Sequence, residues 1–220
     1  MGRNMTLAFP RSANRRTILA GLASLAAPGA VLAAGRPRVV TILGDSITAG
    51  YGLRAGVAVP AQLQAALARL GVVAVVRGAG VSGDTTAGGL ARVDFSVQAD
   101  TDVCVVALGG NNLLQGLDPG AMRADLRRIL ERLKARRIGV VLCGLKAPRS
   151  LNAGYARDFN AVFPALAHEE GVALYPDLLA GVALTAGLNQ RDGLHPNAQG
   201  VRIIARGLAP VVARALRTHR

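Results

Sequence analysis

Five short apolar runs separate longer segments with helical periodicity along this chain. The runs are rich in valine and cover residues 38–43, 72–76, 102–108, 138–144 and 172–176. They show little alternation of apolar and polar residues, which indicates strands that are covered on both faces. Short apolar runs that alternate with helical segments are typical of parallel strands joined by crossover helices. The pattern therefore predicts an α/β fold with helices on both faces of a five-stranded parallel sheet.

Two long helices stand out in the same pattern. The clearest runs from Pro119 to Arg137, begins with Asp118 as its cap, and has one apolar stripe of Met122, Leu126, Ile129, Leu130 and Leu133. The last helix is expected to begin at Pro196 and to carry an apolar stripe of Val201, Ile204 and Leu208. Pro210 lies inside this helix and is expected to kink or split it, because proline has no N–H to donate.

The first 33 residues have the pattern of a cleavable signal peptide. Two arginines precede an apolar run over residues 17–27, and Val31 and Ala33 stand at the −3 and −1 positions of a signal-peptidase site. The uncharged stretch contains Pro28 and is shorter than the ~20 residues that a membrane-spanning helix needs. Cleavage is therefore favoured over a membrane anchor.

The paired arginines, Arg15 and Arg16, are similar to those of a twin-arginine signal. Asn14 and Ile18 replace the serine and the phenylalanine that are typical of that signal. The general secretory route stays open as the alternative. We predict an exported protein, periplasmic or secreted, in which residues 34–220 form one domain, as expected for a chain of this length.

The chain stays basic without the signal peptide. Residues 1–33 hold four of the 26 basic residues and no acidic one, which leaves 22 basic against 13 acidic residues, a net charge of +9. Only 3% of the residues are aromatic, and the arginines are spread over the predicted helices. This pattern does not favour nucleic-acid binding, which needs basic and aromatic residues together. Solvated helix faces explain the charge, and attraction to anionic lipid or cell-wall polymer is the alternative.

The two cysteines, Cys104 and Cys143, both lie inside apolar runs. We expect buried thiols rather than a disulfide, and neither cysteine has a neighbour that suggests a metal ligand. A flavodoxin-type cofactor binder is not favoured either, because no phosphate-binding glycine motif follows the first strand. The sequence thus predicts no metal and no cofactor.

Polar residues and glycines follow the first three predicted strands. The segments are Gly44-Asp45-Ser46, residues 80–84 (GVSGD) and residues 109–112 (GGNN). In open parallel sheets, ligands bind outside the carboxyl ends of the strands. We therefore expect these three segments to lie together at one edge.

Each of these signals has a structural alternative when it is taken alone. Ser46 could cap a helix or act as a nucleophile. Asp192 precedes His195 by three residues, so its carboxylate can bond imidazole Nδ1 and leave Nε2 free, although the same motif also begins helices. Asn111 carries an NH₂ group that an oxyanion hole can use, and Gly83 exposes a backbone N–H.

Taken together, the segments resemble the SGNH (GDSL) hydrolases, and within them the exported arylesterase, thioesterase and lysophospholipase group. The matching motifs are LGDSITAGYGL, GVSGDTTAGGLAR, LGGNN and DGLHPN. The resemblance implies a three-layer α/β/α, flavodoxin-like fold with Ser46 as nucleophile and Asp192 and His195 completing the triad. It also implies an oxyanion hole formed by the Ser46 N–H, Gly83 and Asn111. The family often has an aspartate after the oxyanion asparagine, whereas this chain has Asn112, which leaves the hydrogen bonding of that loop open.

The chemistry of the residues agrees with these roles. A serine hydroxyl is a poor nucleophile until a base accepts its proton, and histidine suits that task at neutral pH. We expect Ser46 to be both the nucleophile and a cap near the N-terminus of a helix, where partial positive charge favours an oxyanion. Asp45 is expected to bond nearby backbone groups without a catalytic role.

The substrate side is less specific. Leu113 and Leu114 form either local core or an acyl-chain surface, and the loop 146–152 brings Pro148 and Arg149 to the opposite wall. We predict a monomeric hydrolase of aryl esters, acyl thioesters or lysophospholipids that contacts lipid transiently. The alternatives are an O-acetyl esterase of carbohydrate or cell-wall polymer and a binding module without turnover, which the intact triad disfavours.

Overall fold

The structure is a computed structural model that describes residues 1–2, 36–148 and 150–219. The predicted signal peptide, beyond its first two residues, and Arg149 lie outside the described residues. None of the described helices is both long and apolar enough to cross a membrane.

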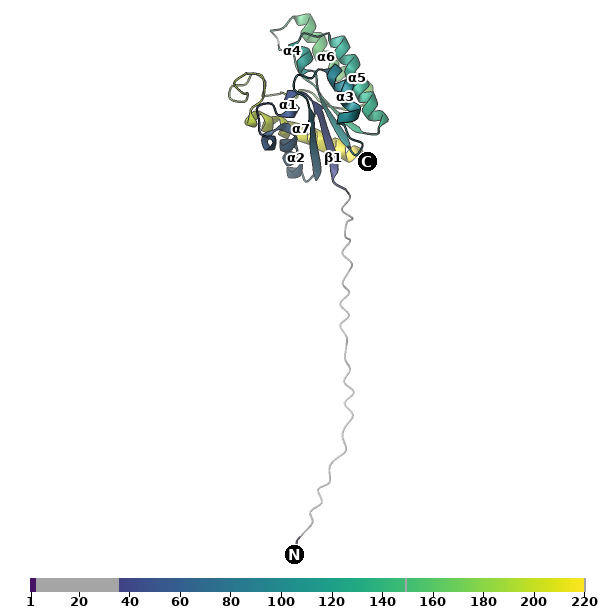
Figure 1. Cartoon of the computed structure of the whole chain (residues 1–220), viewed down its shortest axis with the longest axis vertical. Coiled ribbons are helices and arrows are strands. Elements are labelled where there is room, and N and C mark those ends of the chain that lie inside the picture. The colour runs from purple at the N-terminus through teal and green to yellow at the C-terminus, as the bar shows by residue number, and fades with distance from the viewer. Residues whose placement is uncertain (3–35, 149, 220) are drawn as a thin grey trace. The chain divides into compact units, whose positions relative to one another are not determined.

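Five parallel strands form one sheet in the order β2-β1-β3-β4-β5 (Figure 1). The strands are β1 (Arg38–Gly44), β2 (Ala74–Gly80), β3 (Val103–Ala107), β4 (Gly139–Cys143) and β5 (Ala173–Tyr175). Gly44 pairs with Gly80 on one side and with Ala107 on the other, so β1, β2 and β3 end at the same level. The three polar segments of the sequence therefore leave the sheet side by side.

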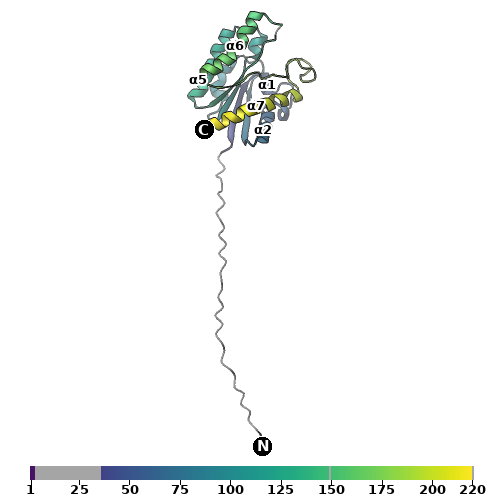
Figure 2. The same cartoon turned by 180° about the vertical axis from the view of Figure 1, so that it is seen from behind.

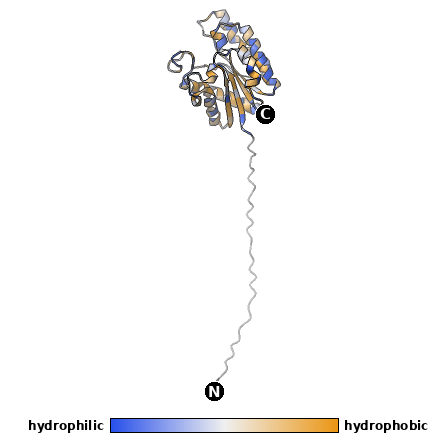
Figure 3. Cartoon of the chain, viewed as in Figure 1, coloured by the Kyte–Doolittle hydropathy of each residue, from blue (hydrophilic) through white to orange (hydrophobic). Residues whose placement is uncertain are grey.

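Helices cover both faces of the sheet (Figures 1 and 2). One face carries α2 (Val59–Arg69) and α7 (Ala198–Thr218), and the other carries α3 (Thr86–Ser96), α5 (Pro119–Ala135) and α6 (Ala153–Glu170). The short helices are α1 (Ser46–Ala49), η1 (Ala55–Val57) and α4 (Gly110–Leu114). The strands are the most hydrophobic part of the domain (Figure 3), and β1, β3 and β4 are buried almost throughout. The predicted three-layer α/β/α fold is confirmed.

Strand β2 begins later and runs further than the predicted strand at 72–76. Its last residue, Gly80, has no side chain to pack and usually weakens a strand. Glycine is required there because α1 lies against this end of β2. A Cβ atom at Gly80 would lie 2.3 Å from the backbone nitrogen of Ala49.

The two long helices follow the sequence pattern, with two corrections to α7. All five residues of the predicted apolar stripe of α5 are buried. Helix α7 begins at Ala198 rather than at Pro196, because the side chain of Asn197 accepts the first free N–H groups of the helix. Pro210 does not split α7, which continues to Thr218. The buried apolar side of α7 holds the helix together across the one missing hydrogen bond.

Both cysteines are free thiols with no exposed surface, in β3 and β4. Burial raises the pKa of the Cys104 thiol to about 12, so it stays protonated at neutral pH. The predicted buried thiols are confirmed.

Candidate active site

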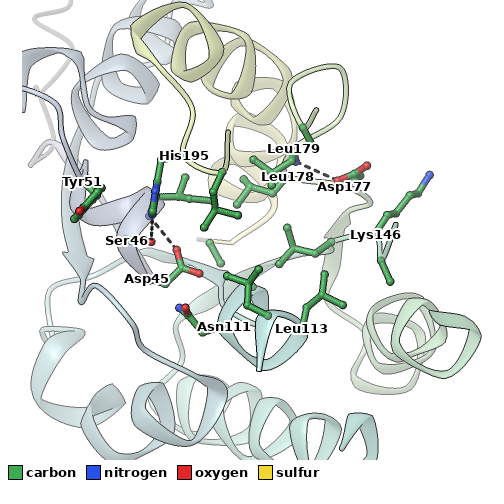
Figure 4. Close-up of a pocket in the computed structure, with 18 of the residues that line it drawn as sticks. Asp45, Ser46, Tyr51, Asn111, Leu113, Lys146, Asp177, Leu178, Leu179 and His195 are labelled. Atoms are coloured by element: carbon green, nitrogen blue, oxygen red, sulfur yellow. Dashed lines mark hydrogen bonds between the residues drawn. The ribbon is translucent and has the colours of Figure 1, made fainter. Parts of the chain in front are cut away.

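Ser46, Asp192 and His195 meet at the carboxyl edge of the sheet, and Figure 4 shows Ser46 beside His195. His195 Nε2 lies 2.9 Å from Ser46 Oγ, and His195 Nδ1 lies 2.7 Å from Asp192 Oδ2. Ser46 is the first residue of α1, just after β1, whereas the other two residues come from the loop before α7. Side chains that are 149 positions apart in the chain thus form one hydrogen-bonded chain.

Asp192 is well suited to hold the imidazole in one orientation. Its Oδ1 accepts the backbone N–H groups of His195, at 3.0 Å, and Leu194, at 2.9 Å. The His195 N–H, the His195 side chain and the Leu194 N–H lower the pKa of Asp192 to about 2. Asp192 is therefore ionised at neutral pH and accepts a hydrogen bond from Nδ1–H, which leaves Nε2 as the acceptor for the Ser46 hydroxyl.

Asp45, not Ser46, caps helix α1. Its side chain accepts the Ile47 N–H at 3.0 Å, so Ser46 is the first residue of the helix. The expectation that Ser46 is the cap is therefore wrong. Asp45 is buried, with 4% of its surface exposed, and this burial raises its pKa to about 6. Its bond to the backbone agrees with the expected structural role.

The predicted oxyanion donors come from the three segments that follow β1, β2 and β3. The Ser46 and Gly83 N–H groups have no hydrogen-bond acceptor among residues 36–148 and 150–219. Gly83 has a φ of 85°, a left-handed conformation that favours glycine. Asn111 Nδ2 donates one hydrogen to the Asp84 carbonyl at 2.8 Å and keeps a second hydrogen. All three residues line the same cavity.

Arg92 of α3 joins the end of β1 to the segment that holds Gly83. Its guanidinium donates to Asp84 Oδ2 at 2.6 Å, to the Gly44 carbonyl at 2.8 Å and to the Ala79 carbonyl at 2.9 Å. The end of β1, the end of β2 and the turn that holds Gly83 are thus fixed by one side chain. Sequence reasoning missed this role, because it depends on contacts that only the fold brings together.

The structure answers the question that Asn112 left open. Its side chain is buried, its Oδ1 accepts the Thr86 N–H, and its Nδ2 donates to Thr86 Oγ1, both at 3.0 Å. Thr86 Oγ1 in turn donates its only hydrogen to Asp125 Oδ2 at 3.0 Å. The amide therefore supplies the donor that Thr86 needs, which a carboxylate cannot do.

Asn112→Asp should consequently destabilise the fold. Two carboxylates would face one hydroxyl hydrogen, and we expect the free energy of unfolding to fall by about 2–3 kcal/mol at pH 7. Urea denaturation measures this change. The loss should shrink at acidic pH, because the new carboxyl group can donate again once it is protonated. In a double variant, Asn112→Asp with Asp125→Asn, residue 125 supplies the donor to Thr86 Oγ1 and residue 112 supplies the acceptor, so most of the stability should be recovered. An unchanged urea midpoint for Asn112→Asp alone would contradict this account.

The cavity beside Ser46 has a volume of about 600 Å³ and is mainly apolar. Leu113, Leu114 and Pro148, the predicted substrate-binding residues, all line it. The sequence did not indicate the rest of the apolar wall, which consists of Ile47, Ala107, Leu145, Ala147, Leu178, Leu179, Ala183 and Leu194. Lys146 and Asp177 lie at the end far from Ser46 (Figure 4).

Tyr51 is a further residue that sequence reasoning missed. Its ring centroid lies 4.6 Å from that of His195, with the two planes tilted by 32°. Tyr51 also lines the cavity, on the side of His195 (Figure 4). It follows the GDSITAG motif directly, but a tyrosine in a loop has many other uses, so the sequence alone could not assign it.

Comparison with known proteins identifies the family. The model of the GDSL-like lipase/acylhydrolase family matches residues 42–203, which include Ser46, Asp192 and His195. The chain belongs to this family. Within the described residues, no group of three or more His, Cys, Asp or Glu side chains could hold a metal ion.

Relatives within the family have related names. The esterase TesA of Pseudomonas aeruginosa is 36% identical over 160 residues, 72% of this chain and 80% of that protein. Thioesterase 1/protease 1/lysophospholipase L1 of Escherichia coli is 36% identical over 170 residues, 76% of this chain and 80% of that protein. The crystal structure of AlinE4, an SGNH-hydrolase family esterase, superposes with a TM-score of 0.69. The two sequences are 43% identical, and the match covers 82% of this chain and 97% of the AlinE4 chain. The predicted SGNH/GDSL family is confirmed.

Proposed function

We propose that this hydrolase of the GDSL-like family cleaves carboxylic esters and acyl thioesters through Ser46, with His195 as the base and Asp192 as its partner. The observation that carries the proposal is the hydrogen-bonded chain from Asp192 through His195 to Ser46. This chain ends at the wall of a large apolar cavity, where an acyl group can lie. The names of the relatives, which include esterase, thioesterase and lysophospholipase, agree with both bond types.

The first half of the reaction transfers the acyl group to the enzyme. Ser46 Oγ attacks the carbonyl carbon while His195 Nε2 accepts its proton, and the carbonyl oxygen becomes an oxyanion. The Ser46 and Gly83 N–H groups and the free hydrogen of Asn111 stabilise this charge. When the intermediate collapses, the alcohol or thiol leaves with the proton from Nε2, and the acyl group stays on Ser46.

The second half releases the acid. Water loses a proton to His195 Nε2 and attacks the acyl carbon through the same oxyanion site. Collapse of this second intermediate returns the proton to Ser46 Oγ and frees the carboxylic acid. The ionised Asp192 stabilises the imidazolium in both halves without taking a proton.

The cavity favours acyl chains over acetylated sugars. A sugar ring would need several polar partners, whereas eight of the wall residues beyond the predicted three are aliphatic and only Lys146 and Asp177 supply charge at the far end. We propose aryl esters, acyl thioesters and lysophospholipids as substrates, with transient lipid contact and a monomeric enzyme.

The proposed location rests on the sequence pattern of residues 1–33. We propose that this segment directs export and is removed, which leaves residues 34–220 as the mature domain in the periplasm or outside the cell. Cell fractionation with mass spectrometry of the mature N-terminus tests this proposal. A double variant, Arg15→Lys with Arg16→Lys, separates the twin-arginine route from the general route, because only the former should stop.

A p-nitrophenyl ester series from acetyl to palmitoyl tests the function. We expect kcat/KM to rise with chain length as the apolar cavity fills, and palmitoyl-thioester and lysophospholipid turnover to follow. Activity on the acetyl ester alone would instead favour the carbohydrate or cell-wall O-acetyl esterase. No turnover, together with no labelling of Ser46 by a fluorophosphonate, would favour the binding module.

Asn111→Ala should lower kcat about 100- to 1000-fold, because the loss of one oxyanion donor typically has that effect. The fold should persist, because within the described residues the Asn111 side chain makes one hydrogen bond, to the Asp84 carbonyl. Turnover of p-nitrophenyl butyrate and thermal unfolding measure the two properties. Leu114→Ala, which changes the same cavity without removing a donor, is the control. A kcat near that of the wild type would remove Asn111 from the mechanism.

A further inference from the structure

The two helical layers differ in charge. Helices α2 and α7 contain no aspartate and no glutamate, and the chain has no acidic residue from Ser46 to Gly83. The opposite layer carries six acids, namely Asp94 in α3, Asp125 and Glu131 in α5, and Asp158, Glu169 and Glu170 in α6. The excess positive charge of the domain is therefore concentrated on the α2–α7 face.

The arginines of the opposite layer are largely neutralised by their neighbours. Arg123 and Arg127 pair with Glu169, Arg132 pairs with Asp94, and Arg157 pairs with Asp158. On the α2–α7 face, by contrast, five arginines make no ion pair and donate no side-chain hydrogen bond within the described residues: Arg69, Arg202, Arg206, Arg214 and Arg217. These five exposed side chains are available to an external anion.

Three of these arginines surround one hollow. Arg69 of α2 and Arg202 and Arg206 of α7 line a cavity of about 240 Å³ between the two helices, together with Gln62. Arg202 and Arg206 are four residues apart, so they are neighbours on the helix surface and repel each other. Arg214 and Arg217 also lie on the exposed side of α7, and Arg217 is about 22 Å from Arg202 along the helix axis, at 1.5 Å per residue. Figure 2 shows α7 crossing the sheet with α2 beside it.

Exposed apolar side chains accompany this charge. Leu70, Val73 and Val75 follow Arg69 in the chain and are 50%, 79% and 41% exposed. A soluble polyanion would gain nothing from these side chains. A lipid surface would bury them at the boundary between headgroups and acyl chains while its phosphates bind the arginines, as interfacial protein surfaces do.

We propose that the α2–α7 face, defined by Arg69, Arg202, Arg206, Arg214 and Arg217 with Leu70 and Val73, docks on the anionic surface of a phospholipid bilayer. The inference rests on the proposed function only in the choice of lipid, which would bring acyl substrates to the enzyme. Helix α7 begins three residues after His195, so its N-terminal end lies at the edge of the sheet that holds the cavity.

Binding to vesicles tests the proposal. The full chain is incubated with vesicles of phosphatidylglycerol and phosphatidylcholine and with vesicles of phosphatidylcholine alone, and mass spectrometry verifies that N-terminal processing is the same in every variant. We expect binding only to the anionic vesicles, and weaker binding as NaCl is raised. An Arg69→Gln, Arg202→Gln, Arg206→Gln variant should bind on the order of 100-fold more weakly, because each arginine near an anionic surface contributes about fivefold.

A matched variant separates a docking face from net charge. Arg128→Gln, Arg132→Gln, Arg157→Gln removes the same charge from exposed positions of α5 and α6 and should bind within threefold of the wild type. Val73→Ser should weaken vesicle binding several-fold and leave retention on immobilised polyphosphate unchanged. Equal losses of vesicle binding in the two triple variants, or full vesicle binding by the Arg69→Gln, Arg202→Gln, Arg206→Gln variant, would overturn the proposal. The proposal would also be overturned if this variant lost retention on polyphosphate but kept its vesicle binding, because the partner would then be a soluble polyanion.

Hydrolysis of p-nitrophenyl butyrate without vesicles should be the same in all variants, since none of the replaced residues lines the active-site cavity. This measurement keeps the two proposals apart. Absent ester turnover in the wild type would contradict the proposed function while vesicle binding is still measured. Normal turnover with no vesicle binding would contradict the docking face alone.

Discussion

Ser46→Ala is expected to lower kcat for ester hydrolysis on the order of 10⁶-fold, as loss of the nucleophile does in other triad hydrolases. The acyl-enzyme cannot form without Oγ, and the small residual rate comes from the oxyanion donors and from substrate binding. The fold should be unaffected, because Ser46 Oγ bonds only to His195 Nε2 within the described residues and because Asp45, not Ser46, caps α1. Steady-state kinetics with p-nitrophenyl butyrate and thermal unfolding measure both properties.

Ser82→Ala is the matched control. Ser82 is exposed and lines the same cavity as Ser46. Ser82→Ala therefore shows the effect of removing a serine that only shapes the cavity. The kcat of this variant should stay within about threefold of the wild type, as for most surface substitutions. Fluorophosphonate should label the wild type and Ser82→Ala at Ser46 and leave Ser46→Ala unlabelled. A Ser46→Ala enzyme with more than a thousandth of wild-type kcat would show that another group attacks the substrate.

The position of the site was predictable because parallel topology converts sequence order into spatial order. Segments that follow β1, β2 and β3 must leave the same edge of the sheet, so Ser46, Gly83 and Asn111 could be placed together without coordinates. His195 and Asp192 could be added because a carboxylate three residues before a histidine can fold back onto Nδ1. The placement of these residues depends on local spacing and on strand direction, whereas their catalytic roles were implied by the resemblance to the SGNH hydrolases.

The details that depend on tertiary contacts could not be predicted. Asp45 and Ser46 are both good cap residues, and propensity cannot decide between adjacent positions. Gly80 looks like a loop residue until α1 is packed against it. The pairing of Tyr51 with His195 and the bonds of Arg92 join distant segments. The uneven distribution of charge likewise appears only once each helix is assigned to a face of the sheet.

The charge of Asp192 leads to the second large effect. Its pKa of about 2 means that Asp192 is ionised throughout the usual assay range, from pH 5 to pH 9. The carboxylate thus contributes no titration to the pH profile there. In the proposed mechanism the carboxylate keeps the imidazole proton on Nδ1.

Asp192→Asn should therefore lower kcat about 10⁴-fold while the loop keeps its conformation. The asparagine oxygen still accepts the N–H groups of Leu194 and His195, but its NH₂ group faces Nδ1 and makes Nδ1 the acceptor. The imidazole proton then sits on Nε2 and points at Ser46, so Nε2 cannot accept the serine proton. Kinetics at pH 7 measures the loss, and an unchanged melting temperature shows that the loop is intact.

Asp177→Asn provides the comparison for this variant. Asp177 lines the far end of the cavity that His195 also lines, and within the described residues its side chain accepts the Leu179 N–H, which an asparagine oxygen also accepts. Asp177→Asn removes one negative charge, as Asp192→Asn does, but it does not touch His195, so kcat should stay close to the wild type. If the two variants lost activity equally, the effect would come from the charge of the cavity; if Asp192→Asn kept more than a tenth of the activity, Asp192 would not set the tautomer of His195.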